Sequence, residues 1–176
     1  NKLEATAMLT GIQIDTKSFT KSAGTRTFDA ASYLRSAGAD GMMIQMFMKE
    51  NADSFMKRNH LISLAELNDS IAICAGEEEQ VYDPVTAAQA ADMLLQVNGI
   101  EASFVITKRA DGMVCISARS MGDVNVQLIM EKMGGGGHLA NAATQIKGKT
   151  IAEVKQTLID QLAKTEDDGN KESTEE

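Results

Sequence analysis

The sequence predicts an α/β fold, and three local patterns predict it. Short apolar runs bounded by glycine, such as Ile-Ala-Ile-Cys-Ala before Gly76, are typical of buried strands. Longer segments repeat apolar residues at helical spacing, as residues 84–95 do. Two strand-like runs are joined by residues 108–112, where an Asp-Gly pair favours a hairpin. Helices and strands therefore alternate along the chain, and we find no internal repeat.

The first residues predict a helix that ends at Gly11. Residues 3–9 have the pattern of a helix end, and a short stretch with Ile12 and Ile14 then leads to Asp15. An Asp directly after an apolar run can cap the next helix, or its carboxylate can be a ligand of a hard divalent ion. Both interpretations of Asp15 stay open from the residues alone.

A polar loop over residues 17–26 precedes two further predicted helices. Thr27 can cap a helix that reaches Gly38, and Asp40 can cap another. We interpret the apolar stripe of the latter as core packing; it consists of Met42, Met43, Met46 and Phe47.

Residues 49–69 stay helix-like but become more polar, which predicts a linker helix between two parts of the chain. His60 lies in this segment without an obvious partner, and we interpret it as a surface or interdomain residue.

The second half of the chain alternates predicted strands and helices. Strands are expected over residues 70–76, 102–107 and 112–118, with a final edge strand over 142–146. Helices are expected to open at Asp83-Pro84, at Gly122-Asp123 and at Ile151. Residues 165–176 are rich in acids and predict a disordered tail.

Net charge restricts the function classes. The formal charge is −8 and the sequence pI is about 4.8. Sequence-independent binding of long nucleic acids needs a basic surface, so we expect no such partner. A small anionic ligand in a local pocket remains compatible with this charge.

Cysteine content and hydropathy indicate the compartment of the chain and whether it contacts a membrane. Cys74 and Cys115 both lie in apolar strand-like runs, which predicts buried free thiols in a reducing compartment. No apolar run approaches the roughly 20 residues of a membrane span, so we expect no membrane contact by this segment. The chain starts with Asn-Lys-Leu-Glu and not with Met, and we expect it to be part of a longer protein.

Four consecutive glycines, Gly134 to Gly137, precede His138. Glycine reaches positive φ without steric cost, and successive bare N–H groups can form a concave anion site. The run therefore predicts a phosphate-binding loop with His138 as a donor beside it. The alternative is a glycine-rich helix stop followed by a turn.

Polar residues gather around one predicted helix, residues 123–133. Arg119 comes at a strand end between Ser117 and Ser120, and the glycine run follows that helix. Arginine binds phosphate through a bidentate fork, so these residues predict an anion-binding rim. The alternative is a solvated Arg119 with serines that cap the turn.

At this point the residues resemble a known family. The Gly-Gly-Gly-Gly-His run, preceded by Ile-Ser-Ala-Arg-Ser at 116–120 and followed by Ala142-Ala143, is similar to the DHHA1 domain of DHH phosphoesterases. Residues 10–16, followed by Thr-Arg-Thr-Phe at 25–28, resemble the last motif of the DHH domain. The resemblance is greatest to the membrane-anchored cyclic-di-AMP phosphodiesterases, and it covers the chain except its acidic tail.

The resemblance implies a mixed sheet flanked by helices, preceded by a helical remnant of the DHH subdomain. The implied domains are residues 1–48 as the end of a DHH domain, 49–69 as the linker helix, 70–164 as the DHHA1 domain and 165–176 as the tail. It also implies that the chain is a cytoplasmic segment of a membrane-anchored parent protein. A similar domain resembles the tail of alanyl-tRNA synthetases, which makes a tRNA-contacting appendage a less favoured alternative.

The family resemblance also implies chemistry. Two divalent ions, typically Mn²⁺, generate the attacking hydroxide and stabilise the charge that develops on the phosphodiester. Asp15 would be a metal ligand. The residues implied to hold substrate are Ser117, Arg119, Ser120, Asn125, Gly135, Gly136, Gly137 and His138.

The chain departs from the family pattern in its metal motifs. It contains no Asp-His-His, its histidines are His60 and His138, and Asp15 supplies at most one ligand. We therefore expect the substrate-binding part of a hydrolase that cleaves cyclic-di-AMP to linear pApA, inactive alone and prone to form a homodimer. The alternatives are a linear-dinucleotide or nanoRNA phosphodiesterase, or a non-catalytic module that binds short adenine dinucleotides or dimerises.

Overall fold

The computed structural model of the chain describes residues 1–172, and of residues 166–172 it describes only the helical backbone. The chain divides into two compact units, Asn1–Asn51 and Ala52–Glu176. The first unit is helical and the second is α/β, which confirms the predicted fold class.

The first unit consists of three helices, α1 (Lys2–Asp15), α2 (Thr25–Ser36) and α3 (Gly41–Phe47). Its small core joins α1 to both other helices and consists of Ala5, Leu9, Leu34, Ala39 and Ile44. Asp40 caps α3 as predicted, because its carboxylate accepts from the amides of Met42 and Met43.

Three predictions for this unit are wrong. Helix α1 continues through Gly11, because Leu9 and Ile12 on either side of it pack on the core, and this outweighs the roughly 1 kcal/mol cost of a helical glycine. Asp15 is therefore the last residue of α1 and not the cap of the next helix. Helix α2 begins at Thr25 with Gly24 as N-cap, not at Thr27.

The predicted core stripe of α3 is also wrong, because in this unit α3 buries only Ile44. Met42 is 72% exposed and Met46 is 64% exposed. A three-helix unit of this size has too few elements to cover every apolar face.

The second unit contains a six-stranded sheet in the order β1-β2-β3-β4-β6-β5. Its strands are β1 (Ala65–Asn68), β2 (Ile71–Ala75), β3 (Ala102–Lys108), β4 (Val114–Ser120), β5 (Gly136–His138) and β6 (Asn141–Ile146). β2 and β3 are parallel and all other neighbours are antiparallel, so the sheet is mixed as expected.

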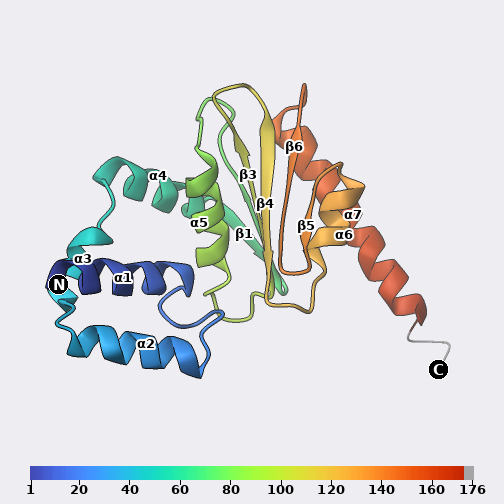
Figure 1. The fold of residues 1–176 in the computed structure, drawn as a ribbon. Helices are drawn as coiled ribbons and strands as arrows, with labels where there is room; N and C mark the ends of the chain where they lie inside the picture. The colour runs from blue at the N-terminus through green and yellow to red at the C-terminus, as the bar shows by residue number, and fades with distance from the viewer. Residues whose placement is uncertain (173–176) are drawn as a thin grey trace. The chain divides into compact units, whose positions relative to one another are not determined.

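Helices cover both faces of this sheet (Figure 1). Helices α4 (Ala52–Ser63) and α5 (Pro84–Leu94) pack on one face, around a core that includes Leu61, Ala90 and Val105. Helices α6 (Val126–Lys132) and α7 (Ile151–Glu172) pack on the other, around Phe104, Met130 and Leu158.

Several predicted elements are confirmed. Strand β2 and the hairpin of β3 and β4 lie where expected. Asp83 is the N-cap of α5, with Pro84 in its first turn. Both cysteines are free, Cys74 fully buried and Cys115 half-buried.

Four predictions for the second unit are wrong. Strand β1 lies inside the predicted linker helix, because its backbone pairs with β2. The edge strand is β5, made by the glycine run, and not β6. Helix α6 opens at Asn125, whose side chain caps it, and not at Gly122-Asp123. Helix α7 continues to Glu172, into the segment predicted to be a disordered tail, since extending a formed helix is easier than starting one. Residues 173–176 of that predicted tail lie outside the described residues. The domain boundaries stay predictions.

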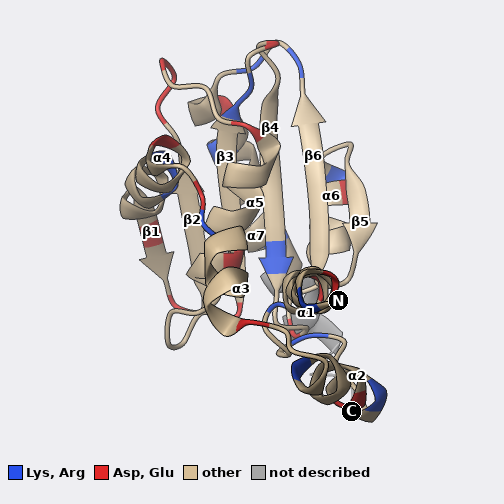
Figure 2. Ribbon diagram, turned by 60° about the vertical axis from the view of Figure 1, so that its left-hand side comes forward, with Lys and Arg blue, Asp and Glu red and all other residues tan. Residues whose placement is uncertain are grey.

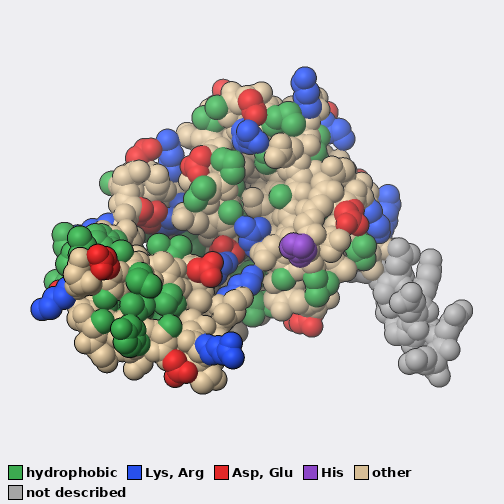
Figure 3. Space-filling view, viewed as in Figure 1, with side chains coloured by type: hydrophobic (Ala, Val, Ile, Leu, Met, Phe, Trp, Pro, Cys, Tyr) green, Lys and Arg blue, Asp and Glu red, His purple; other side chains and the backbone are tan. Residues whose placement is uncertain are grey.

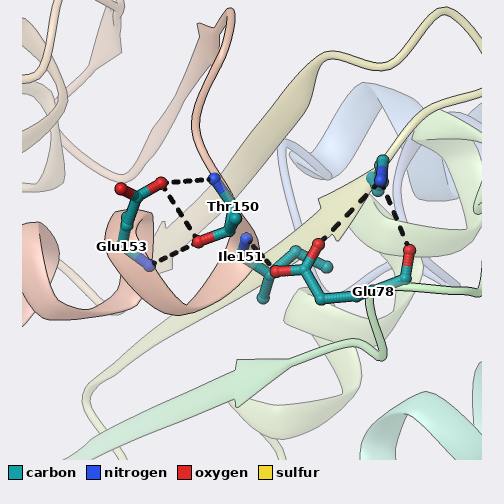
Figure 4. A network of polar contacts seen from close by, with 5 residues as sticks. Glu78, Thr150, Ile151 and Glu153 are labelled. Carbon is teal, nitrogen blue, oxygen red and sulfur yellow. Dashed lines mark hydrogen bonds and ion pairs between the residues drawn. The ribbon is translucent and has the colours of Figure 1, made fainter.

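The start of α7 is tied to the loop after β2 (Figure 4). Thr150 and Glu153 form a reciprocal cap, in which the Thr150 amide donates to the Glu153 carboxylate and the Glu153 amide donates to the Thr150 hydroxyl. The Thr150 amide, and after it the Thr150 hydroxyl, donate to the Glu153 carboxylate and lower its pKa. The Glu78 carboxylate accepts from the Ile151 amide, so this loop holds α7 against the sheet.

Candidate functional site

The register of the sheet brings several predicted site residues to one face. Residues directly opposite on neighbouring strands point to the same side of a sheet. Three such rows face α5. They are Ser103–Arg119–Asn141–His138, Val105–Ser117–Ala143–Gly136, and Thr107–Cys115–Gln145.

Helix α5 packs over the β3 and β4 parts of these rows. Val105 is buried in the α5 core, and the Ser103 hydroxyl donates to the Ala91 carbonyl at 2.7 Å. The members on β4, β6 and β5 are half-buried or exposed. We call this open surface the platform, formed by Ser117, Arg119, Gly136, His138, Asn141 and Ala143.

Arg119 is held in a fixed orientation at the carboxyl end of β4. Its Nε donates to Oδ1 of Asp92 on α5 at 3.1 Å, and its Nη1 donates to the Ala118 carbonyl at 2.9 Å. Figure 2 shows the basic segment of β4 near its arrowhead. Asp92 therefore both positions the guanidinium and compensates part of its charge.

The middle of the platform has small side chains. Ser117, Ala143 and Gly136 lie side by side on β4, β6 and β5. A ligand can approach the backbone closely at such positions. His138 is exposed beside them on the edge strand. A surface with one fixed arginine, a hydroxyl, an imidazole and little steric bulk suits an anionic ligand with a flat or extended body.

The four glycines have different structural roles. Gly134 has φ +81° and ends α6, with its amide donating to the Glu131 carbonyl and that of Gly135 donating to the Met130 carbonyl. This is the glycine helix stop considered above, and it engages both amides within the chain. A Cβ at Gly135 would lie 2.1 Å from the Ala143 carbonyl oxygen, and one at Gly137 would lie 2.4 Å from that of Asn141. Only Gly136 of the four combines ordinary φ with open space at its Cβ position.

Besides Gly135 and Gly137, two predicted substrate-binding residues, Ser120 and Asn125, are not on the platform. Ser120 is buried on the other face of the strand, where its Oγ accepts from the Gly122 amide at 2.9 Å. The Asn125 Oδ1 accepts from the Leu128 amide at 3.3 Å as the cap of α6. Both side chains satisfy backbone groups locally. Their roles in substrate binding stay predictions.

The described residues do not fit a two-metal centre. Asp15 is exposed at the end of α1. His60 Nε2 lies 3.2 Å from the Glu77 carboxylate, a surface pair. Among the side chains that the structure describes, those of residues 1–165, no three from His, Cys, Asp or Glu gather in a way that could hold a metal ion. We therefore assign no step through a metal to this chain.

Sequence reasoning missed Asp92 and Asn141. Asp92 is the single charged residue of α5, and this isolated acid in an alanine-rich helix was an available signal. Asn141 carries no such signal, because its place beside Arg119 depends on the pairing of β4 with β6.

The chain is similar in sequence to known proteins. The chain is 56% identical over 159 residues to the cyclic-di-AMP phosphodiesterase PdeA of Listeria monocytogenes, covering 90% of the chain and 24% of that protein. It is 53% identical over 161 residues to the cyclic-di-AMP phosphodiesterase GdpP of Bacillus subtilis, again covering 90% and 24%. The chain thus spans about a quarter of the length of these relatives.

A solved structure shows the same fold. An exopolyphosphatase-related protein from Bacteroides fragilis aligns with a TM-score of 0.75 at 21% identity, over 91% of this chain and 51% of that one. Among the described residues, no helix is both long and apolar enough to span a membrane. The DHHA1 domain model matches residues 68–164, more than half of the chain, and the protein therefore belongs to the DHHA1 domain family.

Proposed function

We propose that this chain is the substrate-holding part of a phosphodiesterase that hydrolyses cyclic-di-AMP to linear pApA. The observation that carries the proposal is the sheet register, which brings Arg119, Ser117, Gly136 and His138 to one open face. The relatives whose alignments cover about 90% of the chain are named cyclic-di-AMP phosphodiesterases, and these names support a cyclic dinucleotide as the ligand.

On this proposal each platform residue has a binding role. The Nη2 side of the Arg119 guanidinium takes a phosphate oxygen, since Nε donates to Asp92 and Nη1 donates to the Ala118 carbonyl. The Ser117 hydroxyl and the His138 imidazole donate to further oxygens. Gly136 and Ala143 let the sugar–phosphate backbone lie against the sheet. These residues bind and orient the ligand, and they do not activate water.

Hydrolysis belongs to the longer protein on this account. The chain provides no cluster of metal ligands in its described part, so we propose that it binds dinucleotide without Mn²⁺ and does not cleave it alone. The expected two Mn²⁺ ions, the homodimer, the cytoplasmic location and the membrane-anchored parent stay predictions.

Calorimetric titration tests the proposal. We expect the chain to bind cyclic-di-AMP or pApA with and without Mn²⁺. Arg119→Lys keeps the charge but loses the fork, and it should weaken binding by about tenfold or more. Lys132→Ala removes a positive charge from α6, on the other face of the sheet, and should leave affinity unchanged. Absence of binding to the folded chain would contradict the proposal.

The ligand series also separates the alternatives. Tighter binding of pApA than of cyclic-di-AMP would favour a linear-dinucleotide phosphodiesterase. If a longer form of the protein binds both ligands but does not hydrolyse either of them, the non-catalytic module is favoured.

A further inference from the structure

A cavity adjoins the platform on its α5 side. It has a volume of about 80 Å³. The first turns of α5 form one wall and the third cross-strand row forms the floor. Its lining includes Pro84, Ala87, Thr107, Cys115, Ser117, Ala143 and Gln145, with Arg109 at one end.

The cavity and the platform are continuous. Ser117 and Ala143 belong to both, because they lie in the row between Arg119 and Cys115. Neighbouring rows are separated by two residues, about 7 Å along a strand. The row of Cys115 and Gln145 lies two rows, about 14 Å, from that of Arg119, so a ligand with its phosphate at Arg119 extends over Ser117 and Ala143 to reach the cavity.

The chemistry of the cavity suits an uncharged, flat group. Arg109 lies 3.0 Å from Asp111, so its charge is compensated and a second phosphate gains little there. Burial raises the pKa of the Cys115 thiol, which keeps this part of the floor neutral. Pro84 and Ala87 supply an apolar wall.

Gln145 supplies the polar contact at the rim. It is exposed on β6, directly opposite Cys115. A carboxamide has an acceptor and a donor in one plane, and this pair matches the N6 amino group and N7 of adenine. Guanine presents two acceptors at the corresponding edge and satisfies only the donor of the amide.

The size of the cavity decides how a base would bind. About 80 Å³ corresponds to roughly two to three water molecules of liquid volume. This admits the edge of a purine ring and not the whole base. The rest of the ring then lies on the small side chains of Ser117 and Ala143.

We propose that this cavity is a nucleobase subsite, in which Gln145 reads an adenine edge while Arg119 holds the adjoining phosphate. This inference rests on the proposed function and adds to it the base specificity and the residue that determines it.

The test is a titration of the full chain and its variants with cyclic-di-AMP, cyclic-di-GMP and ribose 5-phosphate. Gln145→Ala should weaken cyclic-di-AMP about tenfold, leave ribose 5-phosphate unchanged and remove most of the preference for adenine over guanine. Cys115→Leu fills the cavity and should weaken both cyclic dinucleotides. Gln127→Ala is the matched control, at a half-buried glutamine on α6 whose Nε2 donates to the Glu131 carboxylate.

A second readout does not depend on substitutions in the cavity. Cyclic-di-AMP should slow the alkylation of Cys115, whereas ribose 5-phosphate should not. Cys74 is buried, with burial raising its pKa to about 12, and should stay unreactive in both cases.

The outcomes separate the two proposals. If Arg119→Lys weakens cyclic-di-AMP while Gln145→Ala and Cys115 protection show no effect, the nucleobase subsite is overturned and the proposed function stands. If the folded wild-type chain binds none of the three ligands, both are overturned.

Discussion

At the scale of single residues, the glycine run separates structural from functional requirements. Gly134 is needed for its positive φ, and Gly135 and Gly137 for their close contact with β6. Gly136 has open space where a Cβ would stand, and it faces the platform. Neither the helix stop nor the phosphate loop alone explains all four residues.

Alanine substitutions at these positions should therefore differ. Gly135→Ala and Gly137→Ala force β5 away from β6 and should lower the free energy of unfolding by about 1–3 kcal/mol or more. Gly136→Ala should change it by less than about 0.5 kcal/mol, yet weaken dinucleotide binding because a methyl group then stands on the platform. Urea unfolding and calorimetry measure both. Equal destabilisation by all three would contradict this assignment.

The ion pair of Arg119 and Asp92 predicts that removing the Asp92 charge raises dinucleotide affinity and lowers the free energy of unfolding. Asp92→Asn keeps an acceptor for the Arg119 Nε but removes the compensating charge. We expect dinucleotide affinity to rise roughly fivefold, which is about 1 kcal/mol, with a steeper salt dependence, while the free energy of unfolding falls. Titrations at two salt concentrations measure this. An unchanged affinity would mean that Asp92 does not offset the charge that the ligand meets.

At the scale of elements, the start of α5 supports both the platform and the cavity wall. The Asp83 carboxylate accepts from the Thr86 hydroxyl and from the Thr86 amide. The first of these hydrogen bonds is the main cause that lowers the pKa of Asp83 below its ordinary 3.8. The carboxylate therefore stabilises the fold above that pH, and this contribution is lost as pH falls through the lower pKa of the folded state.

Removing this cap gives a pH-dependent prediction. Asp83→Ala should cost about 1 kcal/mol of unfolding free energy at pH 7. The difference from wild type should shrink at acidic pH, below the ordinary pKa of the group, where the wild-type carboxyl is becoming protonated. Denaturant unfolding at pH 7 and pH 3 checks the sign. A difference that stays constant over this range would contradict an ionised cap.

Local sequence patterns predict only some of the elements. Strand β2, the β3–β4 hairpin and α5 follow from apolar runs, an Asp-Gly turn and an Asp-Pro cap, which are signals within one segment. Strand β1, with the sequence AELN, alternates apolar and polar residues over four positions only, which is too short a signal, and it exists through its pairing with β2. Strand β5 contains two glycines, and the backbone of β6 holds it in the sheet.

In the candidate site too, some positions follow from a pattern within one segment and others depend on pairing between segments. Alternation along β4 puts Ser117 and Arg119 on one face, which a strand pattern alone implies. The approach of His138 and Asn141 to Arg119 depends on the register between distant segments. The same alternation puts Ser120 on the opposite face from Ser117 and Arg119, so its position also follows from the strand pattern alone.

At the scale of the whole molecule, the first unit exposes many apolar side chains. Figure 3 shows hydrophobic side chains gathered over its helices. The exposed large apolar residues of the first unit include Met8, Ile14, Phe28, Tyr33, Met42, Met46 and Phe47. Exposed apolar surface of this kind is typical of an interaction site.

We expect this surface to drive self-association of the isolated chain. Substituting Met42 and Met46 together by Glu should shift the sedimentation coefficient toward that of the monomer. Met121→Glu, at a methionine of the second unit that is 69% exposed, is the control and should leave association unchanged. Identical sedimentation of all three proteins would contradict the expected interface.

The most direct test of the central claim is a backbone amide NMR titration of the chain with cyclic-di-AMP in the absence of metal. The account predicts shift changes over Ser117–Ser120, Gly136–Asn141 and Gln145, with none along α7. Binding with changes confined to other segments, or no change at all in the folded chain, would contradict the claim that this face of the sheet holds the dinucleotide.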